Sequence, residues 1–156
     1  MSNVVDLPES GYSILKVYAG EQVIRPRVPD DDKGEKGTAS FGWDWRRLPV
    51  EREFEVVLSL VIHPNQQRPE YVRVSTVGRF EIVGDTPSVS FDDFVAQQAV
   101  AILLPYARQF ISGLTANSVF GCFYLPTINV AKLMAGVDRS KATGAADGSA
   151  RGSESN

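Results

Sequence analysis

Residues 54 to 84 read FEVVLSLVIHPNQQRPEYVRVSTVGRFEIVG, and this stretch determines the fold class of the chain. From Phe54 to Ile62 the apolar residues fall at every second position, which is the period of a strand with one buried face. HPNQQRPE has the composition of a turn, and EYVRVSTVGRFEIVG returns as a second strand. Because short connections join antiparallel strands, the stretch predicts an antiparallel pair.

Two further strands are expected before this pair. YSILKVYAGEQVIRP, residues 12 to 26, alternates up to its final proline, with Gly20 at a bulge or bend. FGWDW, residues 41 to 45, forms the second. Helical patterns follow from residue 87 onward. An antiparallel sheet of four strands followed by helices is an α+β arrangement.

The FGWDW segment raises a functional question. In an extended chain Phe41, Trp43 and Trp45 share one face. The preceding residues 29–37, PDDDKGEKG, are too charged and glycine-rich to be buried. The three aromatic residues are therefore either part of the core or a platform for another molecule.

The apolar pattern of residues 86–114 predicts a long helix, with Ser90 as its N-cap and a kink or restart at Pro105. Two apolar stripes run along it. A helix on a sheet needs only one such stripe. We expect the first stripe to pack on the sheet: Phe91, Val95, Ala99, Ile102, Tyr106, Phe110 and Leu114. We expect the second to form an oligomer interface: Val100, Leu104, Ala107 and Ile111.

The composition excludes several classes of protein. A net charge of −3 disfavours nucleic-acid binding, and the single cysteine precludes an intramolecular disulfide. The N-terminal segment lacks signal-peptide features, and no apolar run could span a membrane. We expect a soluble, cytoplasmic protein with one domain at residues 11–137. The polar residues 138–156 are expected to form a disordered tail.

Catalysis is not indicated by any motif. His63 is the only histidine and precedes a proline in a turn, so no metal site is expected. Cys122 is the only cysteine, and a single loop cysteine is more often a spectator than a nucleophile. No phosphate-binding loop is present. We therefore predict neither an enzyme nor a cofactor.

LLPYARQFISGL, an aromatic-rich loop and then LPTINVAKLM resemble the SecB family of export chaperones. In that family a Phe-Pro-Tyr-Ala-Arg helix leads through a crossover loop to a Leu-x-Pro-Val/Ile-Asn-like segment and a final helix. YSILKVY, FEVVLSLVI and VGRFEIVG resemble three of the family's strands. The resemblance covers about residues 12 to 134 in the family's order.

The resemblance implies a four-stranded antiparallel sheet with a long kinked helix and a second helix on one face, assembled as a dimer of dimers. It implies a homotetrameric holdase that binds unfolded or precursor polypeptides without nucleotide or metal. The client groove would lie between sheet and crossover loop, lined by Phe41, Trp43, Trp45, Phe120, Phe123, Tyr124 and Leu125. Two functions stay open: a general export chaperone, or a dedicated chaperone of one partner, such as an antitoxin.

The resemblance also implies docking to the translocation ATPase SecA through an acidic patch on the exposed sheet face. Glu21 occupies one acidic position of that patch, whereas Arg25 and Arg73 occupy two others with reversed charge. Like charges at an interface are strongly disfavoured. We therefore expect weak coupling, or none, to the standard export motor.

Overall fold

The computed structural model describes residues 9–25 and 39–135. Four strands precede the helices, as predicted for an α+β fold. The elements are β1 (Tyr12–Arg25), β2 (Ala39–Arg47), β3 (Glu53–Ile62), β4 (Tyr71–Ile82), α1 (Phe91–Asp93), η2 (Phe94–Gln98), α2 (Ala99–Thr115) and α3 (Val130–Ala135). The tail expected at residues 138–156 lies outside the described residues.

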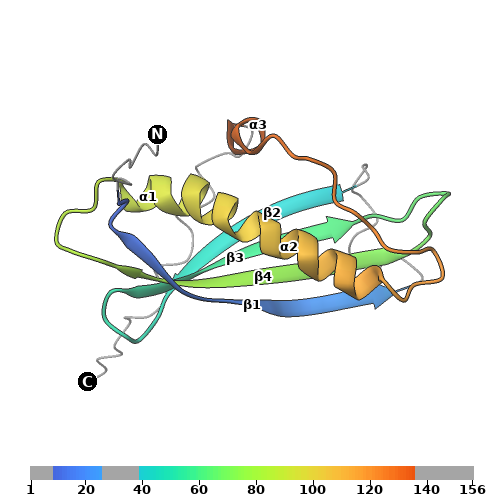
Figure 1. Cartoon of the computed structure of the whole chain (residues 1–156), viewed down its shortest axis with the longest axis horizontal. Coiled ribbons are helices and arrows are strands. Elements are labelled where there is room, and N and C mark those ends of the chain that lie inside the picture. Colours follow the sequence, from blue (N-terminus) through green and yellow to red (C-terminus); the bar gives the residue numbers. More distant parts are fainter. Residues whose placement is uncertain (1–8, 26–38, 136–156) are drawn as a thin grey trace, which may run out of the picture.

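The four strands form one antiparallel sheet in the order β1-β4-β3-β2 (Figure 1). β3 and β4 pair in continuous register from Glu53↔Glu81 to Ile62↔Val72, so the predicted antiparallel pair is confirmed. β1 is an edge strand with two register shifts. The second shift lies between Ala19 and Gln22 and includes Gly20, where the sequence predicted a bulge or bend.

The helices cover one face of this sheet (Figure 1). α2 contacts β4, β1 and β3, and α3 contacts η2. The alternating apolar residues of β3 are buried beneath the helical layer together with Val72, Val74 and Phe80 of β4. Gly78 allows α2 to approach the sheet closely, because a Cβ there would lie 2.7 Å from both Leu103 Cδ2 and Phe80 Cε2. The alternation seen in the sequence therefore predicts the packed face correctly.

The helix itself corrects two expectations. α2 runs from Ala99 to Thr115 through Pro105, so it does not restart at the proline. The second apolar stripe, expected at an oligomer interface, is buried in the core of the single chain: Val100, Leu104, Ala107 and Ile111. In the first stripe Val95 and Ala99 are buried, whereas Ile102 and Tyr106 are 37% and 41% exposed.

The cause of this correction is the π-helical turn η2. The two predicted stripes assume a regular α-helix with 3.6 residues per turn throughout. A π turn closes i→i+5 hydrogen bonds and therefore holds an extra residue. Side chains after Gln98 are rotated relative to those before Phe94, and the face that packs on the sheet changes stripe at this point.

Candidate binding surface

The aromatic residues of β2 lie on the helix-covered face of the sheet. Trp43 is opposite Leu58 and Trp45 is opposite Val56, both core residues of β3. Phe41, Trp43 and Trp45 are half-buried and pack against the core. The prediction that they share one face is confirmed. Each side chain therefore packs against the core on one side and remains partly exposed to solvent on the other.

Two of these rings have further features. Trp45 makes an edge-to-face contact with Phe91 at a centroid distance of 4.8 Å, which fixes the end of the aromatic row to the start of the helix. The indole Nε1 of Trp43 is buried and has no hydrogen-bond acceptor in the part of the chain that the structure describes. An unpaired buried donor is energetically costly.

The second half of the predicted groove is the segment between α2 and α3, residues 116–129, which we call the crossover strap. Tyr124 and Phe120 are 76% and 43% exposed, and Phe123 is half-buried. Leu125 is buried, so it anchors the strap rather than presenting an open contact. Phe123 and Leu125 pack against the same core cluster as the β2 aromatic residues.

The strap is also fastened to α2 by polar bonds. The Phe123 backbone N–H donates to Thr115 Oγ1 at 2.8 Å, and Arg108 donates to the Pro126 carbonyl at 3.2 Å. Ser112 donates to the Phe123 carbonyl at 3.3 Å. In the sequence, Arg108 lies among apolar residues of the long helix, which favours a position on the helix surface or in an ion pair. Its contact with the strap was not foreseen, since a backbone carbonyl leaves no trace in a sequence.

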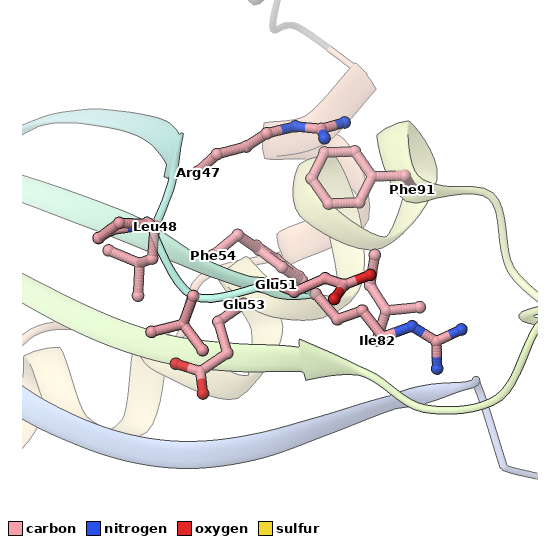
Figure 2. A pocket seen from close by; sticks show the side chains of 10 residues that line it. Arg47, Leu48, Glu51, Glu53, Phe54, Ile82 and Phe91 are labelled. Atoms are coloured by element: carbon pink, nitrogen blue, oxygen red, sulfur yellow. The ribbon is translucent and has the colours of Figure 1, made fainter.

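A pocket of about 200 Å³ lies at the end of the molecule where β2 turns into β3. Figure 2 shows Phe54, Ile82 and Phe91 converging on it from three different elements. Arg47, Glu51, Arg52 and Glu53 add charge to its lining. Arg52 has a positive φ of 66° in this turn and pairs with Asp85 at 2.7 Å. No sequence pattern predicts this pocket, because residues 47–54 form it only together with Ile82 and Phe91, which lie further along the chain.

The outer face of the sheet, away from α2, carries paired charges. Tyr18 Oη donates to Glu55 Oε1 at 2.9 Å, and Arg46 Nη2 lies 2.6 Å from Glu55 Oε2. Burial of Glu55 acts to raise its pKa. Hydrogen bonds from Arg46 and Tyr18 and the charges of Arg46 and Arg79 outweigh burial, so the pKa of Glu55 is lowered. The same hydrogen bond raises the pKa of Tyr18.

The residues considered for motor docking lie on β1 and β4. Register places Arg25 opposite Tyr71 and Arg73 opposite Val23. Arg73 Nε lies 3.6 Å from Glu21 Oε2, so the one acidic candidate is partly neutralised by a neighbouring arginine. In the described region this surface therefore mixes both signs of charge.

The described residues contain no group of three or more His, Cys, Asp or Glu side chains that could hold a metal ion. His63 is buried, with Nε2 at 3.0 Å from Ser40 Oγ. Cys122 Sγ lies 3.3 Å from the Ser112 carbonyl.

None of the described helices has the length and hydrophobicity required to cross a bilayer.

Comparison with known proteins identifies curated relatives. An uncharacterized protein of Methanocaldococcus jannaschii is 38% identical over 73 residues, which are 47% of this chain and 46% of the relative. The protein-export protein SecB of Stenotrophomonas maltophilia is 39% identical over 87 residues, 54% of this chain and 50% of the relative. The chain thus spans about half the length of the curated relatives it matches.

A solved structure has the same fold. The SecB-like chaperone of Mycobacterium tuberculosis, in complex with a ChAD peptide from the HigA1 antitoxin, superimposes with a TM-score of 0.56. It is 15% identical, and the match covers 75% of this chain and 87% of that one. The family profile described as "Preprotein translocase subunit SecB" matches residues 36–140, about two thirds of the sequence. This chain therefore belongs to the SecB family.

Proposed function

We propose that this protein is a chaperone that holds unfolded polypeptides without ATP, on the surface formed by the crossover strap and the β2 aromatic row. One observation carries the proposal: exposed Phe120 and Tyr124 project from a strap whose Phe123 packs on the same core as Phe41, Trp43 and Trp45. Family membership supports it. Membership of the SecB family and an exposed aromatic surface thus both support client binding at this place.

Aromatic surface suits a binder of many sequences. Planar rings offer large contact areas at a small cost in rotamer entropy, and they impose no fixed hydrogen-bonding pattern. Half-buried rings are held in place by the core and so need little ordering when a client binds.

Client binding is tested with a reporter protein kept unfolded by reduction and alkylation. The wild type is expected to bind it without ATP and to change its tryptophan fluorescence. The double variant Phe120→Ser/Tyr124→Ser should bind roughly tenfold more weakly, because exposed aromatic anchors dominate such contacts. Val83→Ser is the matched control, since Val83 is 46% exposed at the opposite end of β4 from the strap. Absence of reporter binding by the wild type would contradict the proposal.

We further propose self-assembly as a dimer of dimers. β1 is an edge strand, so its outer backbone groups face no further strand among the described residues. Ile14, Leu15 and Ile24 of β1 are exposed, as are Ile102 and Tyr106 of α2, which contacts β1. Exposed apolar side chains on neighbouring elements favour contact with another copy. We propose these exposed side chains as the oligomer interface in place of the buried second stripe of α2.

A dedicated chaperone of one partner is the second candidate function. The mixed charge around Glu21, Arg25 and Arg73 favours it, because an acidic dock for SecA is weakened by the two arginines. The M. tuberculosis protein of the same fold, solved with an antitoxin peptide, provides a precedent for a dedicated client. A general holdase should bind several unrelated unfolded reporters with similar affinity, whereas a dedicated chaperone should bind few of them.

A further inference from the structure

Arg68 lies in the turn between β3 and β4, and its side chain is largely buried. Its Nη1 lies 2.8 Å from Glu70 Oε2, and the two side chains are only 11% and 10% exposed. Placing two charges out of water is unfavourable unless further hydrogen bonds satisfy them. The remaining contacts of this pair therefore indicate its purpose.

These remaining contacts lead to the crossover strap. Arg68 Nη2 donates to the Phe120 carbonyl at 3.0 Å and to the Gly121 carbonyl. Ser118 Oγ donates to Glu70 Oε1 at 2.6 Å. The Arg68 guanidinium also lies 5.6 Å from the centre of the Phe123 ring, within the range of a cation–π contact. We call Arg68, Glu70 and Ser118 the Arg68 clasp.

The turn does not need this clasp to keep its own shape. Asn65 Oδ1 accepts from the backbone N–H groups of Gln67 and Arg68, at 2.9 and 2.8 Å. The Asn65 backbone N–H donates to the Arg68 carbonyl at 2.8 Å. These bonds close the turn through one asparagine side chain and the backbone. The Arg68 and Glu70 side chains are thereby left to hold the strap.

The strap depends on the clasp unequally along its length. In its first half Val119 is 90% exposed, and Ala116, Asn117 and Phe120 are also exposed, so little apolar burial holds this part. In its second half Leu125 is buried, and Arg108 bonds the Pro126 carbonyl. Backbone bonds, such as that from the Ser118 N–H to the Thr115 carbonyl at 3.0 Å, join residues 116–121 to the end of α2. The polar bonds to the β3–β4 turn join them to the sheet.

We propose that Arg68 and Glu70 are positioning residues that hold the first half of the strap in place and so keep Phe120 and Phe123 ordered for client binding. This inference rests on the proposed function for its consequence. Its structural part does not, because the attachment of the strap can be measured without any client.

Hydrogen–deuterium exchange on the full chain tests the attachment. In Arg68→Ala, backbone amides of residues 116–122 should exchange at least about tenfold faster, because hydrogen bonds to charged groups are among the stronger ones. Exchange in residues 125–129 and in β3 should stay as in the wild type. Arg68→Lys keeps the charge but cannot donate in a fork to two carbonyls, so its exchange should be intermediate. Arg25→Ala, an exposed arginine of β1, is the control.

A second variant separates attachment from the burial of an unpaired charge. Arg68→Ala alone leaves Glu70 without its cation, whereas Arg68→Ala/Glu70→Gln removes both charges. Accelerated exchange confined to residues 116–122 in both variants supports the clasp. Unchanged exchange in these residues, or equal acceleration across the whole sheet, would overturn it.

Client binding gives the functional arm. Both variants should bind the reduced and alkylated reporter several-fold more weakly than Arg25→Ala, since unordered aromatic anchors must be immobilised on binding. Wild-type affinity together with a loosened strap would overturn the positioning role. Failure of the wild type to bind the reporter would contradict the proposed function instead, while the exchange result would still decide whether the clasp exists.

Discussion

Glu55 shows how one residue on the outer face is stabilised in its charged form. It is opposite Arg79 in the sheet and accepts hydrogen bonds from Tyr18 and Arg46. The carboxylate is almost fully buried, although Arg46 is largely exposed. Removing the carboxylate would leave Tyr18 and Arg46 without their acceptor.

The lowered pKa of Glu55 predicts a pH-dependent contribution to stability. A carboxyl with a folded-state pKa below its unfolded value stabilises the fold above the ordinary 4.5, and this contribution is lost as pH falls through the lowered pKa. Glu55→Gln should therefore lower the free energy of unfolding by about 1–2 kcal/mol at pH 7. The difference from the wild type should shrink at pH 3.5.

Denaturant unfolding at both pH values measures this effect, with Glu51→Gln as the control because Glu51 is exposed. If Glu55→Gln lowers the free energy of unfolding equally at pH 7 and pH 3.5, the Glu55 side chain contributes by packing rather than by charge.

Single residues also mark the limits of what the sequence predicts. The alternation of Phe41, Trp43 and Trp45 correctly places them on one face, because side-chain direction in a strand depends only on position. Arg68 and Glu70 were read as part of a polar turn. Their role depends on a strap about fifty residues later, and no local pattern encodes such a contact.

At the scale of elements, the strands were easier to predict than the helix. β3 and β4 have a strict period of two and a short turn between them, and their pairing follows from these features. The helix was predicted from an ideal period, which the π turn at Phe94–Gln98 breaks. Beyond Ala99 the second stripe, rather than the first, is therefore the one that is buried. The pocket beside the β2–β3 turn was also missed, since it exists only after three elements pack together.

The exposed stripe yields a prediction for assembly. Ile102→Glu/Tyr106→Glu should reduce the size of the oligomer while the thermal unfolding midpoint changes by only a few degrees, because both side chains are already more than one third exposed. Light scattering coupled to size-exclusion chromatography and circular dichroism provide the two measurements.

Two comparisons sharpen this test. Val119→Glu makes the same apolar-to-acidic exchange on the strap and should leave the oligomer intact. Leu104→Glu should unfold the protein, since this leucine is buried in the core. A wild type that is monomeric at micromolar concentration, or a double variant of unchanged size, would contradict the proposed interface.

The described part of the molecule presents two different faces. The helices cover one side of the sheet (Figure 1), and paired charges such as Arg46–Glu55 and Arg73–Glu21 lie on the other. Client holding is proposed for the first face, and docking of the export motor was considered for the second. The two activities can therefore vary independently. Loss of acidic character on the outer face would leave the aromatic surface untouched.

Calorimetric titration with SecA from the same host tests the motor coupling. The wild type is expected to bind weakly or not at all, because Arg25 and Arg73 present positive charge and Arg73 pairs with Glu21. The double variant Arg25→Glu/Arg73→Glu should gain affinity and should become more sensitive to salt. Micromolar or tighter wild-type binding that is lost in Glu21→Arg would show that the docking surface is intact.

Because η2 holds one extra residue, the rotation of α2 about its own axis depends on the number of residues in this π turn. Deleting one residue there would favour a regular helix and turn everything from Ala99 onward by about 100°. Val100 and Leu104 would then rotate away from the sheet, without any change of side chain. The number of residues between Ser90 and Ala99, more than the identity of those that follow, therefore decides which side of α2 other molecules meet.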